Sequence, residues 1–113
     1  RGFDTYDDRV PRPAEATDTL EAARPGADVV DAAAAWLDAA PADPFLLWVH
    51  LYDPHAPYAP PEPWRSRFAD RPYDGEVAYA SAQVGRLLAR LDAKGVTNST
   101  IVVVAGDHGE GLG

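Results

Sequence analysis

The chain contains no cysteine and no methionine, and its basic residues are few: 10 Lys and Arg stand against 18 Asp and Glu, a formal charge of −8 over 113 residues. The absence of cysteine excludes a disulfide framework, a thiolate metal site and a cysteine nucleophile within this sequence. Nucleic-acid binding is disfavoured, because a surface with an isoelectric point near 4.6 repels phosphate. No apolar run approaches the roughly 20 residues of a membrane-spanning helix.

What is present fits one globular domain. Hydrophobic residues make up 46% of the chain and charged residues 25%, which is typical of globular proteins, and the length suits a single domain. The chain begins at Arg1 and stops inside a glycine-rich stretch. We therefore interpret residues 1–113 as one partial domain, truncated at both ends. Its first 27 residues mix proline, acids and small residues and predict an irregular lead-in.

Two helices are predicted in the core, which we expect over 28–113. Apolar side chains recur at helical spacing over 28–40 and again over 75–93. Asp74 suits the N-cap of the second helix, and Gly95 stands where a C-terminal cap belongs.

Two strands are predicted between and after these helices. Residues 45–51 and 100–105 are apolar at almost every position, which favours strands covered on both faces, as in a parallel sheet. Because a helix lies in the crossover between them, the strands should be parallel and the order helix, strand, helix, strand should give an α/β fold. Residues 53–63 hold five prolines and predict a loop.

Chemically useful side chains gather directly after both predicted strands. They are His50, Asp53, His55 and Tyr58 after the first, and Asp107, His108 and Glu110 after the second. Ligands of an open parallel sheet bind beyond the carboxyl ends of its strands. We therefore expect the two segments to face a common crevice.

The residue types suggest a role for each segment and leave alternatives open. Asp107 and His108 offer an oxygen and a nitrogen ligand to a divalent cation, or they form a loop with a capping Asp and a surface His. His55, on a stiff proline-flanked loop, suits hydrogen bonding to an anionic oxygen or proton transfer, or it belongs to an ordinary surface turn. His50 is expected to pack in the core, and Asp53 to cap a turn.

Four segments together resemble the sulfatase family of the alkaline phosphatase superfamily. They are RGFDTYDDRVP, FLLWVHLYDPHAPYAPPEP, YDGEVAYASAQVGRLLARLDAKG and TIVVVAGDHGEGLG. The resemblance implies part of an α/β/α sandwich with a mainly parallel sheet, and a hydrolase of small-molecule or glycan sulfate esters. It implies that Asp107 and His108 are metal ligands, for calcium first and for manganese or zinc as alternatives. It implies that His55 contacts the sulfuryl oxygens and has a catalytic role.

The resemblance also implies features that the sequence does not contain. The family's nucleophile is a formylglycine made from Cys or Ser in a C/S-x-P-x-R context, and no such motif occurs in these residues. We expect that segment upstream of Arg1, the isolated chain to be inactive, and the parent protein to be periplasmic or secreted. The Asp107–His108 pair, where many arylsulfatases carry Asp-Asn, keeps phosphodiester or phosphonate hydrolysis and phosphoglycerol transfer as alternatives. A non-catalytic metal- or anion-binding module is a further alternative.

Overall fold

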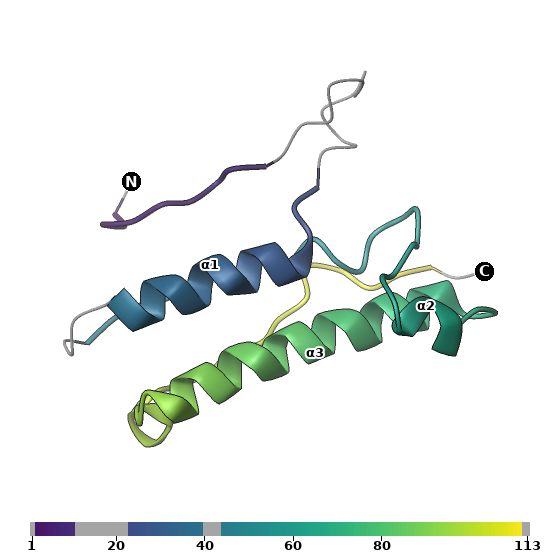
Figure 1. Ribbon diagram of the computed structural model, residues 1–113. Coiled ribbons are helices and arrows are strands. Elements are labelled where there is room, and N and C mark those ends of the chain that lie inside the picture. Colours follow the sequence, from purple (N-terminus) through teal and green to yellow (C-terminus); the bar gives the residue numbers. More distant parts are fainter. Residues whose placement is uncertain (1, 11–22, 40–43, 112–113) are drawn as a thin grey trace.

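The computed structural model of the chain describes residues 2–10, 23–39 and 44–111. Its elements, in chain order, are α1 (Gly26–Ala39), α2 (Trp64–Arg67), α3 (Pro72–Ala93) and the 3₁₀ turn η2 (Thr97–Ser99). Figure 1 shows α1 and α3 side by side and running in the same direction, with α2 beside the start of α3. The core of the described residues therefore lies between two parallel helices.

Helix α1 confirms the predicted first helix, with a start two residues earlier than expected; residue 40 lies outside the described residues. Its buried stripe consists of Val30, Ala33 and Leu37, spaced three and four residues apart. Leu37 is 0% exposed and Val30 is 1% exposed. The apolar periodicity of the sequence thus identified the face that packs on α3.

The predicted second helix is also confirmed, but α3 begins at Pro72, three residues before the expected start. The N-cap position belongs to Arg71 rather than to Asp74. Proline is well suited to the first helical position, because its missing N–H would have no helical partner there. Asp74 instead lies in the first turn and forms an ion pair with Arg71 (3.1 Å).

Gly95 ends α3 as predicted. It adopts a left-handed backbone conformation (φ 76°), and its N–H donates to the carbonyl of Asp92 (2.8 Å). The N–H of Val96 donates to the carbonyl of Leu91 (3.2 Å). This pair of bonds is the Schellman motif, which satisfies carbonyls that the end of a helix leaves without partners.

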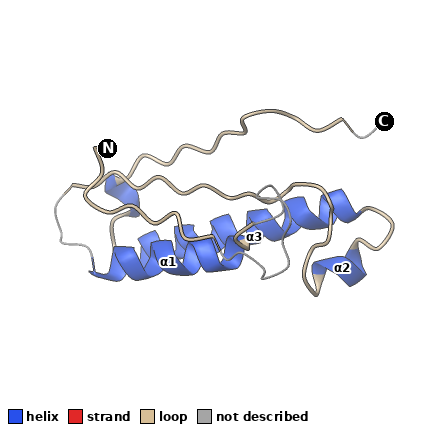
Figure 2. Ribbon diagram, turned by 90° about the horizontal axis from the view of Figure 1, so that it is seen from above, coloured by secondary structure: helices blue, strands red, loops and turns tan. Residues whose placement is uncertain are grey.

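The expected α/β/α sandwich with a mainly parallel sheet is wrong for this structure. Over the described residues the chain contains helices and loops and no strand (Figure 2). Residues 45–51 and 100–105 run without the ladder of backbone hydrogen bonds that defines a sheet. A continuous apolar sequence indicates a tendency toward burial. A strand also needs a second segment about 4.8 Å away with which its backbone forms hydrogen bonds.

The exposure of the two segments shows how they differ from the covered strands that were predicted. Along residues 45–52 exposure alternates, so that one side of the segment is half-buried and the other is open. Leu46 and Trp48 on the open side are 74% and 76% exposed. The apolar residues over 101–104 are exposed throughout. Neither segment is covered on both faces.

The predicted lead-in, residues 1–27, contains no helix or strand over residues 2–10 and 23–25, whereas its last two residues form the start of α1; residues 1 and 11–22 lie outside the described part of the chain. Among the described helices, none combines the length and apolar character needed to cross a membrane.

Candidate functional site

The proline-rich loop over 53–63 is fastened to both long helices. At its start, Asp53 Oδ2 accepts a hydrogen bond from the backbone N–H of Gly26 (3.0 Å), the first residue of α1. Further along, the backbone N–H of Ala59 donates to Oε1 of the buried Glu76 on α3 (2.8 Å). The stretch that contains His55 is therefore held at two points against the helical core.

The anchors on α3 belong to a stripe of polar and aromatic side chains that turns inward. Glu76, Tyr79 and Gln83 are all buried and lie three and four residues apart. The Tyr79 hydroxyl accepts the N–H of Ala27 (2.8 Å), and Gln83 Oε1 accepts a hydrogen bond from Arg86 (2.7 Å). Polar residues at the helical spacing of a buried face are a sequence signal that could have identified these anchors.

His55 has a defined ring orientation although its side chain is exposed. Its Nδ1 lies 2.7 Å from the carbonyl oxygen of Ala56 and 2.9 Å from the hydroxyl of Tyr52. A carbonyl oxygen can only accept a hydrogen bond. We therefore assign the proton of the neutral ring to Nδ1, which leaves Nε2 with a lone pair that can accept a proton or bind a ligand.

Asp107 and His108 lie in an exposed turn and present two ligand atoms to each other. The His108 Nε2 and the Asp107 Oδ2 are 3.8 Å apart. The Nδ1 of His108 lies 2.7 Å from the carbonyl oxygen of Gly109, so that Nδ1 carries the proton and Nε2 is free to coordinate. The hydrogen bond to Gly109, together with the charge of Asp107, raises the pKa of His108 above its usual 6.5.

The donor set fits part of a divalent-metal site. A carboxylate oxygen and an imidazole nitrogen are suitable ligands, and a carbonyl that accepts the other ring N–H is a common support for a ligating histidine. The described residues contain no group of three or more His, Asp or Glu side chains close enough to hold a metal ion. Asp107 and His108 would thus supply two ligands of a larger set.

Tyr58, in the first motif-bearing segment, has its pKa affected by Glu110 in the second. Desolvation is the larger cause of the raised pKa of Tyr58, and interaction with the Glu110 side chain is the next. The Tyr58 ring also packs edge-on against Tyr73 of α3, with ring centroids 5.4 Å apart. The expected common crevice of the two segments stays a prediction, and within the described residues His55 does not join Asp107 and His108 in one cluster.

Two further sequence expectations have different outcomes. His50, expected to be packed in the core, is exposed because it lies on the open side of residues 45–52. Asp53, expected to cap a turn of its own loop, instead caps α1, which lies 27 residues earlier in the chain.

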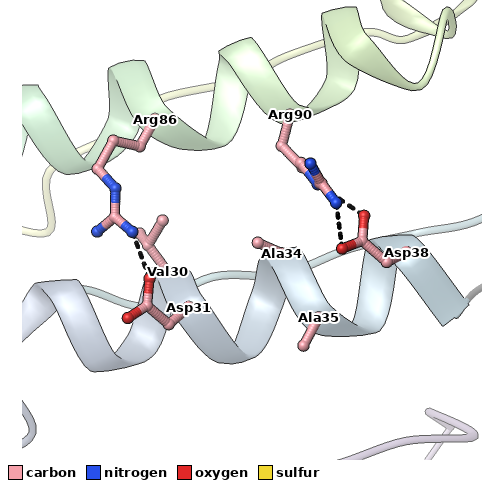
Figure 3. A pocket seen from close by; sticks show the side chains of 7 residues that line it. All are labelled: Val30, Asp31, Ala34, Ala35, Asp38, Arg86 and Arg90. Atoms are coloured by element: carbon pink, nitrogen blue, oxygen red, sulfur yellow. Dashed lines mark hydrogen bonds and ion pairs between the residues drawn. The ribbon is translucent and has the colours of Figure 1, made fainter.

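A groove of about 400 Å³ separates α1 from α3 and lies apart from these motifs. Figure 3 shows that Arg86 reaches Asp31 and that Arg90 reaches Asp38 across it. Each guanidinium is paired with a carboxylate. The two ion pairs therefore connect α1 and α3 across the groove. The candidate site residues lie elsewhere, in the loops.

Comparison with known proteins identifies the family. The family model described as "Sulfatase" matches residues 1–113. The chain therefore belongs to the sulfatase family. Human iduronate 2-sulfatase is 42% identical over 57 residues, which cover 50% of this chain and 10% of that protein. The chain thus corresponds to about a tenth of the length of this curated relative, and no solved structure matches it significantly.

Proposed function

We propose that this chain forms part of the active site of a metal-dependent sulfatase that hydrolyses small-molecule or glycan sulfate esters. Asp107 and His108 supply half of the metal site, and His55 contacts the substrate. The observation that carries the proposal is the family match over the whole chain, and it is supported by both imidazoles presenting Nε2 to their surroundings. A periplasmic or secreted location accompanies the proposal.

His55 would act on the sulfuryl group through Nε2. In the protonated ring Nε2 also carries a proton. The Nε2–H donates to an anionic oxygen or to the leaving oxygen, while Nδ1–H stays bonded to the Ala56 carbonyl. A donor placed where negative charge develops stabilises the transition state more than the ground state. The anchors at Asp53 and Ala59 reduce the reorganisation that the loop would need during the reaction.

Asp107 and His108 would hold the cation, and the flanking glycines allow both side chains of the turn to reach one ion. When bound, the metal supplies positive charge that polarises the ester oxygens. Calcium is the first expectation, with manganese and zinc as alternatives. The formylglycine nucleophile would come from a segment outside residues 1–113.

A second candidate is hydrolysis of phosphodiesters or phosphonates, or phosphoglycerol transfer, on the same scaffold. The observation that favours it is the imidazole in the metal pair, because calcium prefers oxygen ligands whereas imidazole suits manganese and zinc. In this proposal calcium accompanies sulfate ester hydrolysis, and manganese or zinc accompanies the phosphate or phosphonate ester reactions.

Assays of the full-length protein that carries this chain test the proposal. It should hydrolyse an aryl sulfate in preference to a bis-aryl phosphate. His55→Ala should lower kcat about a hundredfold or more with the metal content intact, whereas Asp107→Ala should lose the metal. Asp70→Asn, an exposed loop carboxylate, is the matched control and should change neither quantity.

The opposite pattern of metal content would show that the two roles have been exchanged. Preference for the phosphate ester would select the second candidate. Bound metal without turnover of either ester, together with no formylglycine by mass spectrometry, would favour a non-catalytic binding module.

A further inference from the structure

Tyr52 and His55 form a compact pair at the start of the proline-rich loop. Their rings stack with centroids 4.3 Å apart and planes inclined by 27°. The Tyr52 hydroxyl is also 2.9 Å from the His55 Nδ1. Tyr52 is 38% exposed, whereas Trp48, four residues earlier on the same open side of residues 45–52, is 76% exposed. The difference is consistent with the cover that the imidazole gives to the phenol ring.

The contacts at Nδ1 fix which edge of the imidazole faces the protein. The Ala56 carbonyl, 2.7 Å away, requires a proton on Nδ1, because a bare nitrogen would direct a lone pair at the carbonyl oxygen. The Tyr52 oxygen, 2.9 Å from the same atom, is then a second acceptor for that N–H. A rotation of the ring by 180° would exchange Nδ1 for a carbon atom and would lose both contacts.

The backbone on either side of His55 is already tied to the helices through Asp53 and Ala59. With the loop anchored at these two points, the main freedom of the imidazole is rotation about its own two side-chain bonds. Stacking restricts the plane of the ring, and the contacts at Nδ1 restrict its direction within that plane. Such pre-organisation matters for a group that must meet a substrate atom at hydrogen-bonding distance.

We propose that Tyr52 is a positioning residue that holds the His55 ring with Nδ1–H against the protein and Nε2 directed outward to the substrate. The proposal rests on the proposed substrate contact of His55 and adds to it the residue that orients the contact. Tyr52 itself touches neither the substrate nor the metal ligands in this role. Its effect is exerted entirely through the orientation and the tautomer of His55.

Three variants of the full-length protein separate the contributions of the ring and the hydroxyl. Tyr52→Leu removes the stack and the hydroxyl together, whereas Tyr52→Phe keeps the stack. Tyr6→Leu is the matched control, because Tyr6 is a 76% exposed tyrosine on the lead-in. Protein labelled with ¹⁵N in the histidine rings, with His55→Gln to assign the signal, reports the tautomer of His55 by NMR.

The neutral His55 of the unchanged protein should carry its proton on Nδ1, and Tyr52→Leu should mix the two tautomers. In the same variant kcat should fall roughly ten- to a hundredfold while KM and metal content stay within about twofold. Tyr52→Phe should recover kcat to within about fivefold of the unchanged protein, the scale of one hydrogen bond. Tyr6→Leu should leave the tautomer and kcat unchanged.

Two results would overturn the proposal. One is a neutral His55 that carries its proton on Nε2 in the unchanged protein. The other is a Tyr52→Leu variant whose tautomer or kcat does not move. A failure of the proposed function has a different signature, namely no ester turnover or a His55→Ala variant of full activity. In that case the NMR result alone decides whether Tyr52 orients the ring.

Discussion

Replacement of Asp53 by alanine should destabilise α1 and loosen the loop that carries His55. The half-buried carboxylate accepts the N–H of Gly26 at 3.0 Å, at the first residue of the helix. Loss of a side-chain cap costs typically about 1 kcal/mol, and loss of a negative charge at a helix N-terminus costs about 0.3–1 kcal/mol. Together these predict a fall of about 1.3–2 kcal/mol in the free energy of unfolding.

Urea unfolding of the chain, followed by circular dichroism, measures this fall. Asp53→Asn keeps an oxygen that can accept the Gly26 N–H and loses only the charge, so it should cost less than about 1 kcal/mol. Asp8→Ala, an exposed carboxylate of the lead-in, is the control and should stay within about 0.5 kcal/mol of the unchanged chain.

Hydrogen exchange gives a local check on the same contact. The Gly26 amide should exchange faster in Asp53→Ala, because its acceptor is gone. Gly26→Ala should have a similar effect, since a Cβ at that position would lie 2.9 Å from Asp53 Oδ2 and would displace it. Equal stability of Asp53→Ala and Asp8→Ala, or unchanged protection of Gly26, would refute the capping role.

Two further predictions concern the ion pairs between the helices and the contact between the loops. The hydrogen bond from Arg90 lowers the pKa of Asp38 below its usual 3.8, so the stabilisation it gives is complete above about pH 4 and is lost as the pH falls through the lowered value. Urea midpoints of Asp38→Asn should therefore differ from those of the unchanged chain near neutral pH and converge in acid; a constant difference would contradict this. Tyr58→Phe should weaken metal binding by the full-length protein roughly two- to fivefold, because it removes the phenol hydroxyl that interacts with Glu110, close in sequence to the proposed metal ligands Asp107 and His108. Unchanged affinity in a calorimetric titration would show that the turn does not depend on Tyr58.

The sequence predicted the helices well because their signals are local. The buried stripe of Val30, Ala33 and Leu37 follows directly from helical spacing. The end of α3 follows from Gly95, because a left-handed residue is needed there and glycine adopts that conformation without strain. The predicted start of α3 is wrong because Asp74 suits an N-cap and Pro72 suits the first helical position, and the helix begins at Pro72.

The sheet and the capping of α1 could not be predicted in the same way because both depend on contacts between distant segments. The apolar run over 45–51 is locally indistinguishable from a covered strand, but the structure covers only one of its sides. Asp53 before a proline is a common turn residue. Its actual partner, Gly26, is 27 residues away and is set by the packing of the loop against α1.

His55 and His108 each have Nδ1 close to a backbone carbonyl oxygen, and they differ in the side chain that neighbours the ring. In each, Nδ1 lies 2.7 Å from the carbonyl oxygen of the next residue, which leaves Nε2 available to bind a ligand or a proton. His108 has the Asp107 carboxylate 3.8 Å from that atom, a pairing that adds a second ligand for a cation. His55 is instead stacked on the ring of Tyr52, which restricts its direction without adding a ligand. The same ring orientation thus places Nε2 beside a carboxylate in His108, which suits the proposed metal site, and beside no second ligand in His55, which suits the proposed contact with an anionic ester.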